Sequence, residues 1–328
     1  MTILRRASQC LLLVGILCGS FFGYKYYLRA TFLPVRYPFI TANAFCALAK
    51  HHFDHPQKWR ILLTGQSFDP AAVQDGDIIY VKNSPFYLPR FFKNVHPKIK
   101  ARYILLSHNG DDPVPGAYEQ FLADDKIVAW AGCNVNLPNH PKMISLPIGI
   151  MGILNKKLPS NCQELWGRLL LDQRMGKLER KNFFYNNMNI TTNTTERGRA
   201  VLAFKNQSFC FNAKVKPYAD YLREMATYKF VLSPHGFGLD CYRTWEALML
   251  GCIPVVKTSV LDCLYDGLPV LIVNDWEEAT QEYLEQRYSQ MSQQSYALDR
   301  LFIDYWVNLF RRRSLELLEQ ACASKVAL

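Results

Sequence analysis

The chain has 328 residues, of which 49% are hydrophobic and 20% are charged. That length exceeds one ordinary core and the composition is that of a packed globular protein, so we expect two domains. The formal net charge of +10 is scattered along the chain without a zinc-finger, KH or RRM signature, which makes a nucleic-acid partner the weaker interpretation. The ten cysteines contain no CxxC pair, which argues against a zinc ribbon or a thioredoxin-type redox site.

The first predicted element is an apolar segment at residues 10–24, which contains no charged residue and follows Arg5 and Arg6. A cleaved signal peptide is the alternative, but aromatic residues crowd the positions after its one small-residue cleavage candidate and fit an interfacial belt better. We therefore predict a cytoplasmic tail and signal-anchor helix over residues 1–30 and a stem over residues 31–58. The protein would then be a single-pass type II membrane protein, in the Golgi or ER lumen if its source is eukaryotic.

Two series of short apolar runs follow, and most are apolar on both faces. The runs are residues 60–64, 77–81, 103–107, 127–130 and 143–146, then 182–185, 229–232, 253–256 and 270–273. Because helix-length intervals separate them, they predict parallel α/β sheets. We place one domain with its linker at residues 59–178 and a second at residues 179–328, which an amphipathic helix over residues 296–319 closes.

A glycine-rich loop joins a strand to a helix in the second domain. The strand ends at Ser233, the loop contains Gly236 and Gly238, and we expect Asp240 to be the N-cap of a helix that ends at Gly251. Ligands of open α/β sheets bind at such a place, between the carboxyl ends of strands and helix N-termini. Closely approaching glycine backbone and free helix amides favour a phosphate group.

Two charged residues strengthen the interpretation of this helix as part of a phosphate site. Arg243 adds a permanent charge with fork geometry for a diphosphate, and Glu246 lies three residues later on the same face, where a carboxylate can accept from a ribose diol. The alternative is a simple turn and a local Arg243–Glu246 ion pair. The residues expected to bind the nucleotide are Pro234, His235, Gly236, Phe237, Gly238, Asp240, Arg243, Glu246 and, from the opposite wall, Lys205. Arg197 or Arg199 could add charge from the same wall.

Residues 228–256, YKFVLSPHGFGLDCYRTWEALMLGCIPVV, closely resemble the C-terminal signature of the exostosin-like glycosyltransferases, family 47 and its relatives. Weaker similarities lie at residues 107–112 and 147–150. The resemblance implies a GT-B fold, in which two Rossmann-like domains face a cleft and bind the donor mainly through the second domain and the acceptor through the first. It also implies an inverting transfer that needs no metal and no cofactor besides the nucleotide-diphosphate sugar, which is the donor substrate.

An inverting transfer also needs a general base from the acceptor side. Three candidates lie just past the strand at residues 103–107: His108, Asp111 and Asp112. A solvated turn is the alternative interpretation of this stretch. The D-x-D pattern Asp75-Gly76-Asp77 is better explained as a turn before a strand than as a metal site.

Taken together, the sequence predicts a glycosyltransferase that moves a hexose or pentose to a glycan or glycoprotein acceptor. The alternative is a catalytically inactive exostosin-like relative that binds and assists an active transferase. A membrane-tethered hydrolase has less support, because no G-x-S-x-G elbow and no metal-ligand cluster is visible in the sequence.

Overall fold

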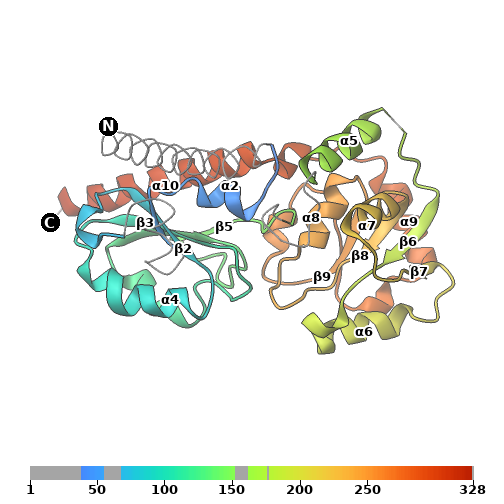
Figure 1. Ribbon diagram of the computed structural model, residues 1–328, viewed down its shortest axis with the longest axis horizontal. Helices are drawn as coiled ribbons and strands as arrows, with labels where there is room; N and C mark the ends of the chain where they lie inside the picture. The colour runs from blue at the N-terminus through green and yellow to red at the C-terminus, as the bar shows by residue number, and fades with distance from the viewer. Residues whose placement is uncertain (1–37, 55–67, 152–161, 176, 327–328) are drawn as a thin grey trace, which may run out of the picture. The chain divides into compact units, whose positions relative to one another are not determined.

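The computed structural model describes residues 38–54, 68–151, 162–175 and 177–326, which all belong to one compact unit (Figure 1). These residues form two five-stranded sheets in which every neighbouring pair of strands is parallel. The predicted α/β class with parallel sheets is therefore confirmed. The run predicted as a strand at residues 60–64 lies outside the described residues.

The first sheet contains five strands in the order β1-β2-β3-β4-β5. Its strands are β1 (His51–Phe53), β2 (Asp77–Lys82), β3 (Tyr103–His108), β4 (Ile127–Gly132) and β5 (Met143–Ser145). Every residue of β3 and β4 is buried, as expected for strands covered on both faces. The short helices of this half are α2 (Ala42–Cys46) and α4 (Tyr87–Arg90). β1 was not predicted, because its sequence HHF is short and half polar.

The second sheet has the order β10-β9-β8-β6-β7. Its strands are β6 (Asn182–Asn186), β7 (Cys210–Asn212), β8 (Tyr228–Leu232), β9 (Ile253–Lys257) and β10 (Leu271–Val273). The chain therefore leaves β6 toward one edge and returns on its other side as β8, so the sheet is doubly wound, with its switch point between β6 and β8. The three-residue edge strand β7 was not predicted.

Helices connect and cover these strands. They are α5 (Cys162–Arg174), α6 (Thr194–Phe204), α7 (Tyr218–Met225), α8 (Tyr242–Met249), α9 (Gln281–Met291) and α10 (Ile303–Val326). Short 3-10 helices lie at Pro70–Ala72, His96–Lys98, Gly116–Ala123, Ile190–Thr192, Asp262–Tyr265, Trp276–Glu278 and Leu298–Leu301, and a π-helical turn lies at Phe91–Val95.

The closing helix is confirmed, although α10 begins at Ile303, seven residues later than the predicted start at residue 296. It packs against β4, and one apolar cluster unites Leu106 of β3, Val231 of β8 and Phe310 of α10. The predicted domain division after residue 178 falls between α5 and β6, in a stretch without helix or strand. The division itself stays a prediction.

The predicted signal-anchor helix at residues 1–30 lies outside the described residues. Within residues 38–54, 68–151, 162–175 and 177–326, no helix has both the length and the apolar composition needed to cross a bilayer. Among the cysteines whose side chains the structure describes, Cys133, Cys210, Cys241, Cys252, Cys263 and Cys322 are free thiols.

Candidate functional site

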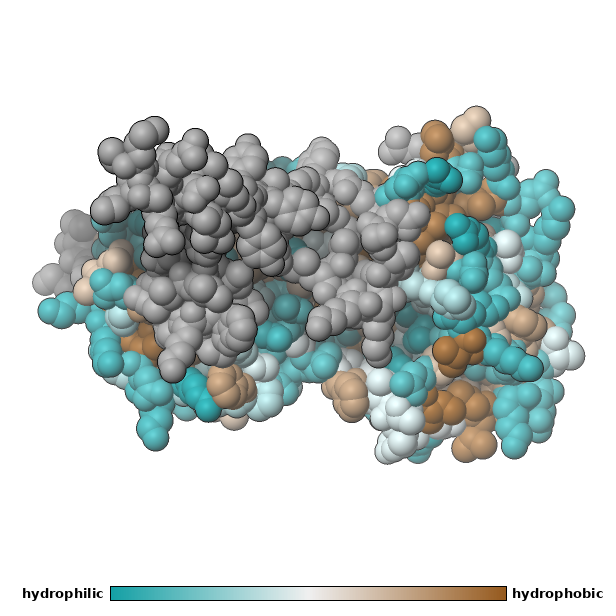
Figure 2. Space-filling model, in the orientation of Figure 1, coloured by the Kyte–Doolittle hydropathy of each residue, from teal (hydrophilic) through white to brown (hydrophobic). Residues whose placement is uncertain are grey.

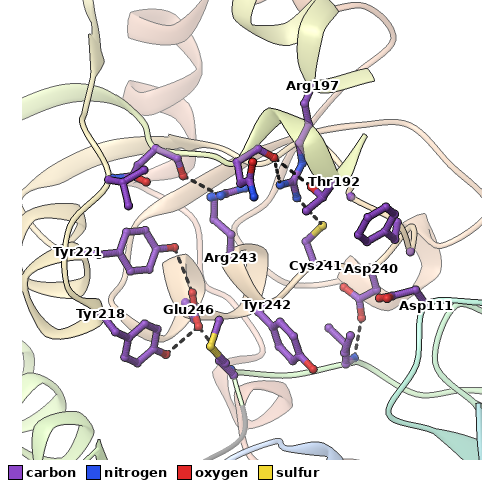
Figure 3. Close-up of a pocket in the computed structure, with 18 of the residues that line it drawn as sticks. Asp111, Thr192, Arg197, Tyr218, Tyr221, Asp240, Cys241, Tyr242, Arg243 and Glu246 are labelled. Carbon is purple, nitrogen blue, oxygen red and sulfur yellow. Dashed lines mark hydrogen bonds between the residues drawn. The ribbon is translucent and has the colours of Figure 1, made fainter. Parts of the chain in front are cut away.

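A pocket of about 510 Å³ opens where β6 and β8 end (Figure 3). Asn187 and Asn189 follow β6, and residues 236–238, 240 and 241 follow β8; all of these residues line the pocket. This is the switch point of the second sheet, the place at which doubly wound sheets bind ligands. From the first half, Asp111, Ile148 and Met151 also line it. A volume of this size accommodates a nucleotide-sized ligand.

Helix α6 holds the glycine loop in place from one side. The N-cap Asn193 donates from Nδ2 to Gly236 O at 3.0 Å, and the Arg197 Nε donates to His235 O at 3.2 Å. Gly236 N in turn donates to Gly238 O at 3.2 Å and closes the loop on itself. Pro234 is buried and His235 half-buried, so these two predicted residues support the loop from outside the pocket lining.

Asn134, which follows β4, holds the same loop from the first half of the chain. Its Oδ1 accepts from Asp240 N at 2.8 Å, and its Nδ2 donates to Gly110 O at 3.1 Å, beside Asp111. A Cβ added to Gly238 would lie 2.7 Å from Asn134 Nδ2, so this glycine is needed for close approach. A single amide therefore joins the glycine loop to the loop that contains Asp111.

Asp240 lines the pocket, but the prediction that it is the N-cap of the helix is wrong. The N-cap of α8 is Cys241, and it makes no side-chain capping bond. The Asp240 carboxyl instead accepts from Ile148 N at 2.6 Å and from Trp245 Nε1 at 2.8 Å. Because the side chain is only 3% exposed, burial raises the pKa of this carboxyl to about 6. Asp240 thus connects the glycine loop to the segment after β5.

Arg243 lines the pocket, but as the second residue of α8 and not one turn into the helix as predicted. Its Nη2 donates to Asn187 O at 2.7 Å, while Nε and Nη1 are buried and find no acceptor among the described residues. No ion pair with Glu246 forms within the part of the chain that the structure describes, so the alternative of a local ion pair is not supported. Buried guanidinium donors without acceptors are unfavourable, and an anionic ligand would satisfy them after a small side-chain rotation.

A second guanidinium, that of Arg197, lies on the same wall of the pocket (Figure 3). It is 7% exposed, and burial together with the nearby Arg243 lowers its pKa. Two partly desolvated cations repel each other until an anion joins them. Lys205 was predicted to supply charge from this region, but it is exposed at the C-cap of α6 and does not line the pocket. Arg197 takes the place expected for it.

Glu246 also lines the pocket, but its carboxyl is already hydrogen-bonded. Its Oε1 accepts from Tyr218 OH at 2.7 Å and from Met151 N at 3.4 Å, and its Oε2 accepts from Tyr221 OH at 3.1 Å. Burial raises the pKa of this carboxyl. A ribose diol that donates to Glu246 would have to compete with the three donors that this carboxyl already accepts from. The geometry therefore favours Glu246 as a residue that positions Tyr218 and Tyr221 at one end of the pocket (Figure 3).

The three candidates for the general base lie in different environments. His108 is fully buried: its Nε2 lies 3.0 Å from Pro147 O and its Nδ1 accepts from Asn109 N at 2.8 Å. Burial lowers its pKa to about 4, so it has no ring nitrogen available and is a poor base. Asp112 is not part of the pocket lining, and its carbonyl accepts from Asn83 Nδ2 at 2.6 Å.

Asp111 is the candidate that lines the pocket. Although this residue is exposed, partial loss of hydration, and then the neighbouring Asp112, raise the pKa of its carboxyl. A raised pKa makes a carboxylate a stronger base. Its loop is fixed in place, since a Cβ on Gly110 would lie 1.4 Å from Asn83 O. The structure thus places Asp111, but neither His108 nor Asp112, in the lining of the pocket that contains the residues predicted to bind the nucleotide.

Comparison with protein families gives a match over the second half of the chain. Residues 183–323 match the model of the family described as RXYLT1 C-terminal domain. This similarity agrees with the resemblance to exostosin-like glycosyltransferases that the motif at residues 228–256 predicted. The match begins at β6 and ends within α10, so the matched region contains both arginines, the glycine loop and Glu246.

Several solved structures have some likeness to the chain. One is the Arabidopsis thaliana starch synthase IV catalytic domain bound to ADP and acarbose. The sequence identity is 11% and the TM-score is 0.39, over 79% of this chain and 75% of that one. An E. coli trehalose-6-phosphate structure bound with UDP-2-fluoro glucose has 12% identity and TM-score 0.35 over 76% and 70%. A GtfA/B complex has 14% identity and TM-score 0.32 over 74% and 58%. All three TM-scores are low, so the fold is described from its two parallel sheets and not from these similarities. No curated protein sequence matches the chain significantly.

Sequence reasoning missed several residues at or beside the pocket. Tyr218 and Tyr221 share a face of α7, and their spacing of three residues was a visible signal for a common role. Asn134 had no such signal, because its partners are loops distant in the sequence. On the face shown in Figure 2, hydrophobic residues form small separate patches on a mainly hydrophilic surface. Two of the most exposed hydrophobic side chains, Val215 at 89% and Phe237 at 73%, line the pocket.

Proposed function

We propose that this protein is a glycosyltransferase that moves a sugar from a nucleotide-diphosphate donor to a glycan or glycoprotein hydroxyl, with inversion and without a metal at the diphosphate. One observation carries the proposal: the buried Nε and Nη1 of Arg243 find no acceptor among the described residues, although Arg243 lines the pocket at the switch point. A diphosphate supplies such acceptors in a geometry that a guanidinium matches.

The wall around Arg243 suits a leaving nucleoside diphosphate. Arg197 adds a second cation, and Gly236 and Gly238 allow the backbone to approach a phosphate closely. Two guanidinium groups can balance the charge that develops on the diphosphate as the bond to the sugar breaks. This arrangement supports a transfer in which arginine, rather than a divalent cation, stabilises the leaving group.

Tyr218 and Tyr221, at the end of the pocket away from Asp111, suit the nucleoside (Figure 3). Their ring centroids lie 6.0 Å apart, and Glu246 fixes both hydroxyls. Rings held in this way offer an aromatic surface to a base or a ribose at little entropic cost. The sugar would then extend toward Asp240 and Asp111.

Asp111 is our candidate for the general base. Its carboxylate would take the proton from the acceptor hydroxyl while the acceptor oxygen attacks the anomeric carbon and the diphosphate leaves from the opposite side. Bond formation on the face opposite the leaving group inverts the anomeric centre. Positioned proton transfer of this kind contributes about 10²–10⁴-fold to a rate.

The experiment that tests this function is a donor screen followed by a transfer assay. The family matched by residues 183–323 is an exostosin-like xylosyltransferase family, so UDP-xylose heads a panel of UDP- and GDP-sugars tested by thermal shift and calorimetry. We expect one donor to raise the melting temperature and to be consumed in the presence of an acceptor. If no nucleotide sugar binds, the proposal is wrong.

Asp111→Asn tests the base, and Asp112→Asn is the matched control at the neighbouring position. We expect Asp111→Asn to lower kcat about 10²-fold or more with donor affinity unchanged, and Asp112→Asn to stay near the wild type. Donor binding without turnover on any acceptor would favour the inactive-partner alternative. Signal-anchor topology and a Golgi or ER location remain predictions, to be tested by protease protection and imaging of the full chain.

A further inference from the structure

Three side chains with metal-binding atoms meet at the edge of the first sheet, apart from the pocket described above. The thiol of Cys46, the imidazole of His52 and the carboxyl of Asp54 each place one ligand atom within 4.8 Å of the other two. All three residues are half-buried, so an ion bound here would be shielded from much of the solvent without being closed off.

Local structure brings these three residues together. α2 ends at Cys46, and after a short turn the chain enters β1, which pairs with β2 so that His52 lies opposite Tyr80. Side chains alternate along a strand, so His52 and Asp54 share one face of β1. The other face is occupied differently: Phe53 packs against Phe68 at a ring distance of 6.1 Å.

The observed spacing agrees with tetrahedral coordination. Cys46 Sγ lies 3.4 Å from His52 Nδ1. Zinc–sulfur bonds of about 2.3 Å and zinc–nitrogen bonds of about 2.0–2.1 Å place a thiolate and an imidazole nitrogen about 3.5 Å apart at a tetrahedral ion. A thiol–imidazole hydrogen bond has the same spacing for this pair, so the geometric case for an ion comes from the third group, the Asp54 carboxyl, which lies within 4.8 Å of both.

The ligand set distinguishes between metals. A thiolate and an imidazole suit a borderline-soft ion, whereas magnesium and calcium require oxygen ligands. A thiolate, an imidazole and a carboxylate leave one tetrahedral position for water or a fourth ligand.

We propose that Cys46, His52 and Asp54 form a zinc site that fastens the end of α2 to β1. None of the three residues lines the pocket at the switch point, so this ion would not hold the donor diphosphate. Asp54 follows β1 at the carboxyl edge of the parallel sheet, the same edge from which Asp111 follows β3. Because the three residues lie outside the pocket lining, we assign the ion a role in stabilising the first half of the protein.

The test is metal analysis of the full chain, purified in reducing buffer without chelator and then reconstituted with zinc. We expect equimolar zinc by mass spectrometry of the metal. Cobalt in place of zinc should produce the near-ultraviolet charge-transfer band of a thiolate–cobalt bond. Cys46→Ser should abolish that band, and Cys46→Ser, His52→Ala and Asp54→Asn should each weaken zinc binding by at least about tenfold. Magnesium and calcium should not compete.

Cys263→Ser, which removes an exposed thiol elsewhere, is the matched control and should keep both the zinc and the cobalt band. Wild-type protein that binds no zinc after reconstitution, or a cobalt complex without the thiolate band, overturns the proposal even if the ligand variants fail to fold. Zinc retained by Cys46→Ser overturns it as well. Because none of these measurements uses a nucleotide sugar, the result is independent of the proposed transferase activity.

Discussion

Replacing Arg243 by alanine separates a ligand-binding role from a structural one. The substitution removes one hydrogen bond, from Nη2 to Asn187 O, and also two buried donors that have no acceptor among the described residues. Hydrogen bonds from a charged donor contribute about 1.5–3 kcal/mol each. Two such bonds to a diphosphate contribute about 3–6 kcal/mol, and at about 1.4 kcal/mol per factor of ten their loss weakens nucleotide affinity about 10²–10⁴-fold.

Stability should change little, or even increase, because unsatisfied buried donors are removed together with one satisfied donor. The assay is calorimetric titration with a nucleoside diphosphate, combined with thermal unfolding of each variant. Arg243→Lys keeps the charge without the fork and should fall between the wild type and the alanine variant. Arg199→Ala removes an exposed charge from α6 outside the pocket and is the control. Arg243→Ala that unfolds at a lower temperature but binds nucleotide as tightly as the wild type would refute the reasoning.

Two further predictions concern residues that join the two halves. Asn134→Ala should destabilise the protein by about 2–4 kcal/mol in urea unfolding, because it loses two hydrogen bonds and places alanine at φ 56°, and it should lower kcat more than donor affinity. Asn134→Gly should recover about 1 kcal/mol of that stability, because glycine adopts a positive φ without strain. An equal loss of stability in both variants would exclude the backbone contribution. Asp240 has a pKa raised from the ordinary 3.8 to about 6, so the folded state binds its proton more tightly and loses up to about 3 kcal/mol of stability as the pH rises through that window. We expect the free energy of unfolding of the wild type to fall relative to that of Asp240→Asn as the pH rises from about 4 to about 6, and the difference to stay constant from there to about pH 7. A difference that does not change with pH would contradict the assigned pKa.

The strands that were predicted from the sequence are mainly buried ones, because burial on both faces of a sheet requires a continuous run of apolar residues. β3 reads YILLSH and is buried on both faces, so its apolar run is a direct consequence of its position in a parallel sheet. β1 and β7 lie at sheet edges and have three residues each, so neither requires an apolar run. Their pairing depends on neighbouring strands, which no local pattern encodes.

The site was predicted where one stretch of chain determines it. The loop and Arg243 follow from a single strand–loop–helix unit, whose helix N-terminus is a natural place for an anionic ligand. Lys205 was wrong because α6 continues to Phe204 and leaves that lysine at its exposed end, whereas Arg197 points inward. The environment of Glu246 could not be predicted, since its partners Tyr218 and Tyr221 come from another helix.

The glycine loop also indicates where the protein can change without losing its fold. A side chain at residue 236 would begin 2.9 Å from Arg197, and one at residue 238 would begin 2.7 Å from Asn134, so a substitution at either position would displace a residue that holds the loop. Phe237 between them is 73% exposed and lines the pocket. We therefore expect Phe237 to tolerate substitution better than its two neighbours. Changes at this position can alter substrate preference, whereas the loop backbone proposed to bind the diphosphate stays the same.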